Sequence, residues 1–111
     1  MDIKVTRTPL EHFKELAKNA AHKYAMRVVV SPLAHKQAVS DVSQAFLAGA
    51  MEYREVMDTY RTTRILPPHL DEIKKHAFDK FCENFGYQSE ETRNAFMIDV
   101  YKGVGWGIDN D

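Results

Sequence analysis

The stretch QAFLAGAMEYREVMDTYRTTR, residues 44–64, is a clear indication of a helical fold. Around it, apolar residues recur at alternating steps of three and four, which is typical of a long helix packed against other helices. The repeating positions are Val39, Val42, Phe46, Gly49, Tyr53, Val56 and Tyr60. Ser40 offers a second N-cap, so residues 33–64 form one or two helices, and the sustained seam favours a single helix from residue 39 onward.

The chain before this stretch begins with a clear helix start. Residues 8–11 read Thr-Pro-Leu-Glu, a capping box with proline at the first helical position. The apolar steps that follow predict an amphipathic helix over residues 9–25. Residues 3–7 alternate apolar and polar side chains, and residues 26–30 hold three consecutive valines. These two segments predict at most a short two-stranded β-ribbon.

The chain after this stretch is divided by equally plain signals. Pro67 and Pro68 end the long helix, because proline cannot continue one. A third helix is expected over residues 68–85, with Gly86 as its left-handed terminator. Ser89 is the N-cap of a fourth helix. Residues 103–111 form a glycine-spaced tail (Gly103, Gly105, Gly107), which we expect to lie outside that helix.

The composition fits one mostly α domain over residues 1–111, a bundle of four to five helices. An apolar fraction of 44% and a charged fraction of 28% are ordinary for a globular protein. The single cysteine, Cys82, cannot form an intramolecular disulfide, and the N-terminus shows no signal peptide. No apolar run reaches the ~20 residues that a membrane-spanning helix needs. We therefore expect a cytoplasmic protein.

Catalytic patterns are scarce in this chain. His69, Glu72 and His76 lie at helical steps of three and four, a spacing compatible with a metal-dependent enzyme site. That helix face also continues into charged residues, which favours a solvated surface. Cys82 falls on the apolar face between Phe81 and Phe85, which favours a buried, inert thiol over a nucleophile. The sequence therefore predicts a protein without enzymatic activity, cofactor or bound metal.

The middle of the long helix is rich in small residues, which are Ala45, Ala48, Gly49 and Ala50. Glycine in a helix costs ~1 kcal/mol relative to alanine, so a closely approaching backbone should offset that cost. The approaching helix is the first or third of the same chain, or the equivalent helix of a second copy. We predict a homodimer or higher homo-oligomer built on residues 39–60. The self-association residues would be Phe46, Gly49 and Ala50.

The second half of the stretch carries a tyrosine and arginine stripe. Its residues are Tyr53, Arg54, Met57, Tyr60, Arg61 and Arg64. Tyr, Met and Arg are enriched at protein interfaces, so the stripe predicts a surface for a protein partner. The same residue types stack on bases and pair with phosphates, so a nucleotide or single-stranded nucleic acid is the alternative ligand. In a third interpretation the tyrosines pack into the core, and Arg54 and Arg61 pair with Asp58.

These patterns together predict a small binding protein that occupies the surface of a protein partner. Inhibitors and regulators encoded by phages and mobile elements are of this kind. The alternatives are a nucleotide or nucleic-acid binder using the stripe, and a metal-dependent enzyme using the His/Glu/His face. Trp106, the only tryptophan, is expected to dock on the helices rather than to remain exposed as a partner anchor.

Overall fold

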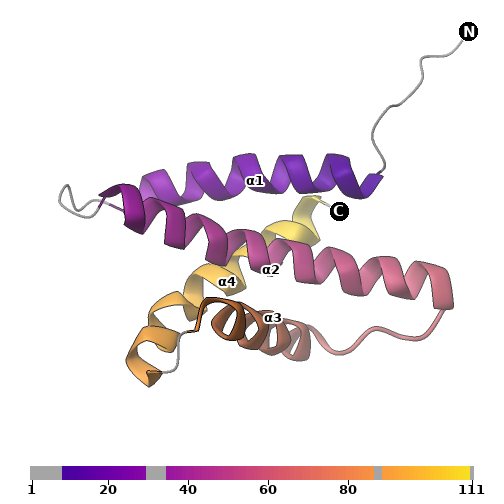
Figure 1. Cartoon of the computed structure of the whole chain (residues 1–111). Helices are drawn as coiled ribbons and strands as arrows, with labels where there is room; N and C mark the ends of the chain where they lie inside the picture. Colours follow the sequence, from indigo (N-terminus) through magenta and orange to yellow (C-terminus); the bar gives the residue numbers. More distant parts are fainter. Residues whose placement is uncertain (1–8, 30–34, 87–88, 111) are drawn as a thin grey trace, which may run out of the picture.

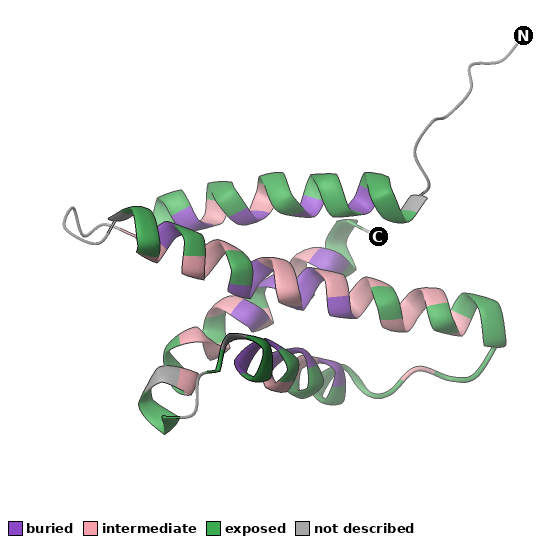
Figure 2. Cartoon of the chain, viewed as in Figure 1, coloured by how far each residue is buried: buried purple, intermediate pink, exposed green. Residues whose placement is uncertain are grey.

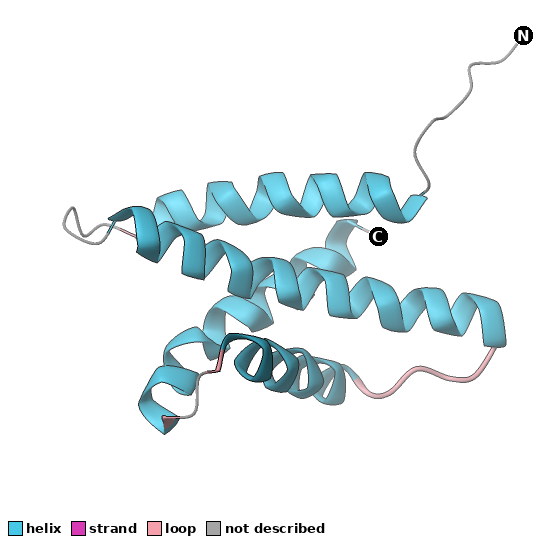
Figure 3. Ribbon diagram, in the orientation of Figure 1, coloured by secondary structure: helices cyan, strands magenta, loops and turns pink. Residues whose placement is uncertain are grey.

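The computed structural model describes residues 9–29, 35–86 and 89–110. Four helices account for nearly all of these residues, and no strand occurs among them (Figure 3). The helices are α1 (Pro9–Val28), α2 (His35–Thr63), α3 (Leu70–Phe85) and α4 (Glu90–Asn110). The predicted helical bundle is thereby confirmed. No helix within the described ranges is both long and apolar enough to cross a membrane.

The long helix α2 is the centre of the bundle and packs against each of the other three helices. Its 29 residues span about 44 Å at 1.5 Å per residue. Figure 1 shows α1 running along one side of α2, α3 lying on the other side, and α4 crossing behind. The molecule is elongated, with principal dimensions of 52 × 33 × 22 Å.

The face of α1 that packs in the bundle carries one phenylalanine and three alanines at regular spacing. Phe13, Ala17, Ala21 and Ala25 follow one another at steps of four and are almost completely buried. Figure 2 shows the buried parts of α1 along its lower edge, which faces α2. Phe13 and Ala17 meet Ala50 of α2 in a small apolar cluster. Alanine allows the two helices to lie close together without a loss of side-chain entropy.

The larger core lies where α2, α3 and α4 meet. The helix α3 contributes five buried residues, which are Ile73, Ala77, Phe78, Phe81 and Cys82. They pack against Val100 and Val104 of α4, both fully buried, and against Ala45 of α2. Phe81 and Cys82 lie on the apolar face that the sequence predicts, so that prediction is confirmed for them.

The ends of α3 follow the predicted stop and start signals. Gly86 adopts the left-handed conformation with φ of 69°, and its N–H donates to the carbonyl oxygens of Cys82 and Glu83. The predicted glycine terminator is confirmed. At the other end, His69 is the N-cap, and its Nδ1 accepts a hydrogen bond of 3.3 Å from the Asp71 N–H. The helix therefore begins two residues later than the predicted residue 68.

The predicted β-ribbon is not found in the described part of the chain. Residues 26–28 belong to the last turn of α1, so the strand predicted from its valines is wrong there. Residues 3–7 and residue 30 lie outside the described residues. The preference of valine for strands is weak, and packing of the neighbouring Ala25 against the rest of the bundle carries the helix onward.

The prediction of a non-helical tail is also wrong, because α4 continues through residues 103–110. Two of its glycines leave room for α2 where a side chain would collide. A Cβ atom on Gly103 would lie 1.9 Å from the carbonyl oxygen of Phe46, and one on Gly107 would lie 2.9 Å from Cδ2 of Tyr53. Close packing with α2 therefore offsets the ~1 kcal/mol that each glycine costs in helix propensity.

The crossing of α2 and α4 is built from a reciprocal pair of glycines. A Cβ atom on Gly49 would lie 2.0 Å from the carbonyl oxygen of Val100. Gly49 thus faces the carbonyl group of Val100, three residues before Gly103, and Gly103 faces that of Phe46, three residues before Gly49. The two backbones therefore touch directly. The close approach predicted at Gly49 is found, but the approaching helix is α4 of the same chain and not α1 or α3.

Candidate functional site

The C-terminal end of α2 projects beyond α3 in Figure 1 and leads into an extended connection. Arg64 ends the helix in the left-handed region with φ of 61°, and its N–H donates to the Tyr60 carbonyl oxygen at 2.7 Å. A side chain in this region is uncommon and costs roughly 1 kcal/mol. Pro67 and Pro68 restrict the backbone after it. The geometry of the connection is therefore restrained at both ends.

Between these restraints lie two adjacent apolar residues that we call the exposed apolar pair, Ile65 and Leu66. Their exposed fractions are 71% and 81%, the highest of any large apolar side chain in the part of the chain that the structure describes. Exposed apolar surface of this kind is unfavourable in water and is typical of interaction sites. The exposed apolar pair is the main feature of the candidate site.

A buried carboxylate lies across a cavity from this connection. Glu52 is only 6% exposed, and its Oε2 lies 2.6 Å from Nδ1 of His76, while Lys80 Nζ donates to its Oε1 at 3.0 Å. The bond to Glu52 raises the pKa of Lys80 above its ordinary value. Both partners come from α3, so the cluster joins α2 to α3. A cavity of about 300 Å³ lies between this cluster and the apolar pair.

The predicted tyrosine and arginine stripe is divided by the structure. Arg54 Nε lies 3.1 Å from Asp58, and its guanidinium lies 5.1 Å from the centroid of the Phe13 ring. Arg61 Nη1 lies 2.8 Å from the same Asp58 carboxylate. The pairing of Arg54 and Arg61 with Asp58 is therefore confirmed. Tyr53 packs against the larger core, beside Gly107.

The rest of the stripe lies closer to the exposed apolar pair. Met57 and Tyr60 are partly buried, and Tyr60 lines the cavity beneath the connection. Arg64 is exposed directly before Ile65. The structure thus gathers Tyr60, Arg61 and Arg64 near the end of α2, and it turns Tyr53 and Arg54 toward the rest of the bundle.

The predicted self-association residues are occupied within one chain. Phe46 is 4% exposed, Ala50 is fully buried, and Gly49 is buried against α4. Contact between two copies through these side chains would require α1 or α4 to move away from α2. The oligomeric state itself remains a prediction.

The three residues of the alternative metal site do not converge on one point. His69 caps α3, His76 contacts Glu52, and Glu72 is exposed. Within the described ranges, no group of three His, Cys, Asp or Glu side chains is arranged to hold a metal ion. Sequence reasoning missed Glu52. The sequence offers one signal for this cluster. Glu52 lies beside the apolar seam of the long helix, and His76 and Lys80 are four residues apart, so they share one face of the third helix.

Two further predictions have clear outcomes. Cys82 is 1% exposed, and burial raises the pKa of its thiol, so the prediction of a buried cysteine is confirmed. Trp106 docks on the helices as predicted, with its ring centroid 5.4 Å from that of Phe13 and 6.3 Å from that of Phe46. It does so from within α4 and not from a folded-back tail.

Comparison of the chain with protein-family models, with curated proteins and with solved structures finds no match. The function must therefore be inferred from the residues and their geometry.

Proposed function

We propose that this chain is a non-enzymatic binding protein that acts by occupying the surface of a protein partner. The observation that carries the proposal is the exposed apolar pair, Ile65 and Leu66, with exposed fractions of 71% and 81%. Inhibitors and regulators act in this way, and those of phages and mobile elements are among them.

The restrained backbone around the pair favours binding. A loop that already has its bound conformation loses little entropy on association, so more of the contact energy appears as affinity. Arg64 in the left-handed region and the two prolines at 67 and 68 provide such restraint.

The charges around the pair favour a protein over a nucleic acid. A nucleic-acid site needs several cations directed at phosphates. Arg54 and Arg61 share Asp58, and Lys80 contacts Glu52 and Glu55. The partner that fits is a protein with an apolar cleft for Ile65 and Leu66 and an acidic group at its edge for Arg64.

Site-specific photo-crosslinking in cells tests this proposal. A benzophenone amino acid replaces Leu66 in one variant and Ile98 in the control, because Ile98 is also an exposed apolar residue (61%) but lies on α4. We expect one discrete protein adduct from position 66 and none from position 98. Arg64→Glu should weaken that adduct, because it reverses the charge beside the pair.

Equal adducts from both positions would refute the proposed surface. An adduct that nuclease digestion removes, together with oligonucleotide affinity that falls steeply with added salt, would instead establish the nucleic-acid alternative. An adduct between two copies of this chain would identify a homo-oligomer that uses the exposed apolar pair and not Phe46, Gly49 and Ala50.

A further inference from the structure

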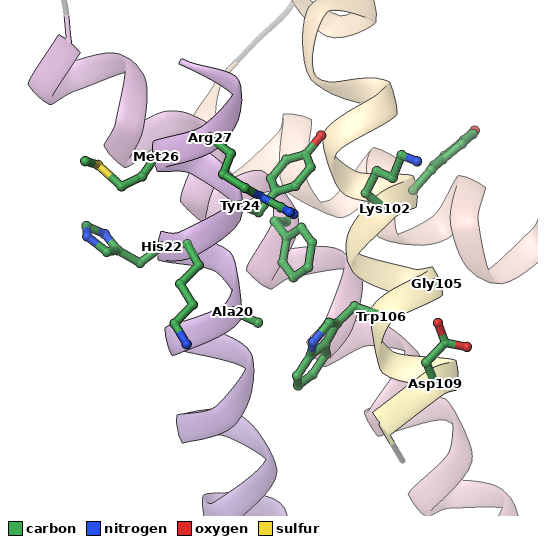
Figure 4. A pocket seen from close by; sticks show the side chains of 12 residues that line it. Ala20, His22, Tyr24, Met26, Arg27, Lys102, Gly105, Trp106 and Asp109 are labelled. Atoms are coloured by element: carbon green, nitrogen blue, oxygen red, sulfur yellow. The ribbon is translucent and has the colours of Figure 1, made fainter. Parts of the chain in front are cut away.

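A groove of about 890 Å³ separates α1 from α4, with Phe46 of α2 also lining it. Two contacts bridge the helices beside it. The Tyr24 hydroxyl donates to Asp99 Oδ1 at 2.8 Å, and the rings of Trp106 and Phe13 pack with centroids 5.4 Å apart. Figure 4 shows the groove with the indole of Trp106 directed from α4 toward α1. Its volume lies within the range of about 300–1,000 Å³ that small-molecule sites occupy.

The interior of the groove is aromatic. Phe46, which is only 4% exposed, contributes to the lining, and its ring centroid lies 5.0 Å from that of Tyr24 and 6.3 Å from that of Trp106. Tyr24 and Trp106 are partly buried, so each still presents some ring surface. Aromatic surfaces of this kind favour a flat apolar ligand, which gains both apolar burial and ring contacts.

The rim of the groove is mainly cationic. Lys23 and Arg27 of α1 and Lys102 of α4 line it, against a single lining acid, Asp109. Figure 4 shows the Arg27 side chain reaching toward α4, while the Asp109 carboxylate points to the side of α4 away from α1. Asp99, just outside the lining, is bonded to Tyr24. An anionic group on the ligand would meet complementary charge at this rim.

The wall that α4 contributes contains a glycine without a packing partner. A Cβ atom on Gly105 would have nothing within 4 Å, in contrast to the crowded positions at Gly103 and Gly107. Glycine in a helix costs ~1 kcal/mol relative to alanine, and the protein's own atoms give no reason for it here. Close approach of a ligand to the backbone would provide that reason. Ala20, which lines the groove from α1, also has a small side chain.

We infer that this groove binds a small aromatic anion, with its flat body between Trp106 and Ala20 and its anionic group at Arg27, Lys23 and Lys102. This site is separate from the exposed apolar pair, so its failure would leave the proposed protein-binding function intact. An aromatic carboxylate and a nucleoside phosphate share the required chemistry.

The test uses the fluorescent probe anilinonaphthalene sulfonate, which is itself an aromatic anion. Trp106 is the only tryptophan, so quenching of its emission by bound dye reports binding near the groove. We expect saturable binding of one dye per chain to protein that retains its helical circular dichroism. Phenylnaphthylamine, a neutral analogue of the dye, should bind about tenfold more weakly, because it lacks the anionic group.

Three variants locate the probe. Gly105→Leu should weaken dye binding about tenfold or more, because its Cβ atom meets nothing within 4 Å and the rest of its side chain occupies the groove. Ala20→Leu blocks the groove from α1 and carries the test if the first variant fails to fold. Arg27→Ala should weaken binding of the dye but not of its neutral analogue. Ala95→Leu adds the same apolar side chain at an exposed position of α4 and should change nothing.

Competition distinguishes the two sources of ligand. Displacement of the dye by naphthoate would assign a carboxylate ligand, and displacement by adenosine monophosphate would assign a phosphate. The inference is overturned if neither competitor displaces the dye, if Gly105→Leu or Ala20→Leu binds it as the native protein does, or if the neutral analogue binds equally well.

Discussion

Two faces of α4 use glycine in opposite ways. On one face, Gly103 and Gly107 are buried against α2, and an added Cβ atom would meet Phe46 or Tyr53 within 3 Å. On the other face, Gly105 borders the groove beside α1, where an added Cβ atom would meet nothing within 4 Å. We refer to these as the closed face and the open face of α4.

The helical period explains why neighbouring glycines differ so much. A step of four residues returns to nearly the same face of a helix, whereas a step of two turns about 200° to the opposite face. Gly103 and Gly107 therefore share the closed face, and Gly105 lies on the open one. On the closed face, packing against α2 compensates the helix-propensity cost of glycine. On the open face, we infer that a bound ligand compensates it.

The largest expected effect comes from adding one methyl group to the closed face. Gly103→Ala places a Cβ atom 1.9 Å from the Phe46 carbonyl oxygen, so α2 and α4 must separate along the whole crossing. We expect a loss of ~3 kcal/mol or more in the free energy of unfolding, at the upper end of overpacking effects. Urea denaturation followed by circular dichroism measures it. Gly49→Ala, the other half of the pair, should cost a similar amount, and a loss below ~1 kcal/mol in both would show that the crossing is loose.

The matched change on the open face should have the opposite sign. Gly105→Ala removes the helix-propensity cost of glycine and enters open space. We expect the free energy of unfolding to increase by roughly 0.5–1 kcal/mol, measured in the same denaturation experiment. A destabilising Gly105→Ala would mean that α1 lies closer to α4 than the groove indicates. The comparison of the two faces would then fail.

Local sequence signals predicted the parts of this fold that depend on neighbours in the chain. The glycine terminator at Gly86 and the pairing of Arg54 and Arg61 with Asp58 involve residues within four positions of one another. The buried face of α3 follows from the helical period alone. Each of these features is determined within one or two turns, so no knowledge of the tertiary partner is needed.

Three of the features that were missed depend on a distant segment. The helical conformation of residues 103–110 requires the backbone of α2 against Gly103, and Gly49 requires α4, more than fifty residues away in the chain. The role of Glu52 likewise depends on His76 and Lys80 of α3. Propensity penalises glycine in every helix and carries no information about which helix will approach it.

A smaller effect is expected at the bond that joins α1 to α4 beside the open face. Burial, together with the hydrogen bond to the Asp99 carboxylate, raises the pKa of Tyr24 from 10.0 to about 12. Tyr24→Phe should lower the free energy of unfolding at neutral pH by about 0.5–1 kcal/mol, the worth of one hydrogen bond. A folded-state pKa above the unfolded value gives stability that is complete below pH 10 and is lost as the pH rises through 12.

The difference between the native protein and Tyr24→Phe should therefore shrink over that alkaline range. Denaturation at several pH values measures it, and Tyr60→Phe, which removes a hydroxyl outside the groove, is the control. A difference that grows with alkaline pH would show that the folded protein does not favour the protonated form of the Tyr24 hydroxyl.

The smallest effect concerns the carboxylate of the same bond. Burial raises the pKa of Asp99 above its ordinary value of 3.8, and the hydrogen bond from Tyr24 offsets only part of that rise. The folded state therefore prefers the protonated acid, so the native protein loses stability as the pH rises from the ordinary carboxyl pKa through the folded one.

Asp99→Asn keeps an oxygen that accepts from Tyr24 but carries no charge. We expect it to match the native protein in acid and to exceed it at neutral pH by less than about 1 kcal/mol, because Asp99 is only partly buried. Asp109→Asn, which removes one charge from the same groove at an exposed position, controls for net charge. If the advantage of Asp99→Asn is instead largest in acid, the charged form of Asp99 stabilises the folded protein. The hydrogen bond from Tyr24 would then outweigh the cost of burying that charge.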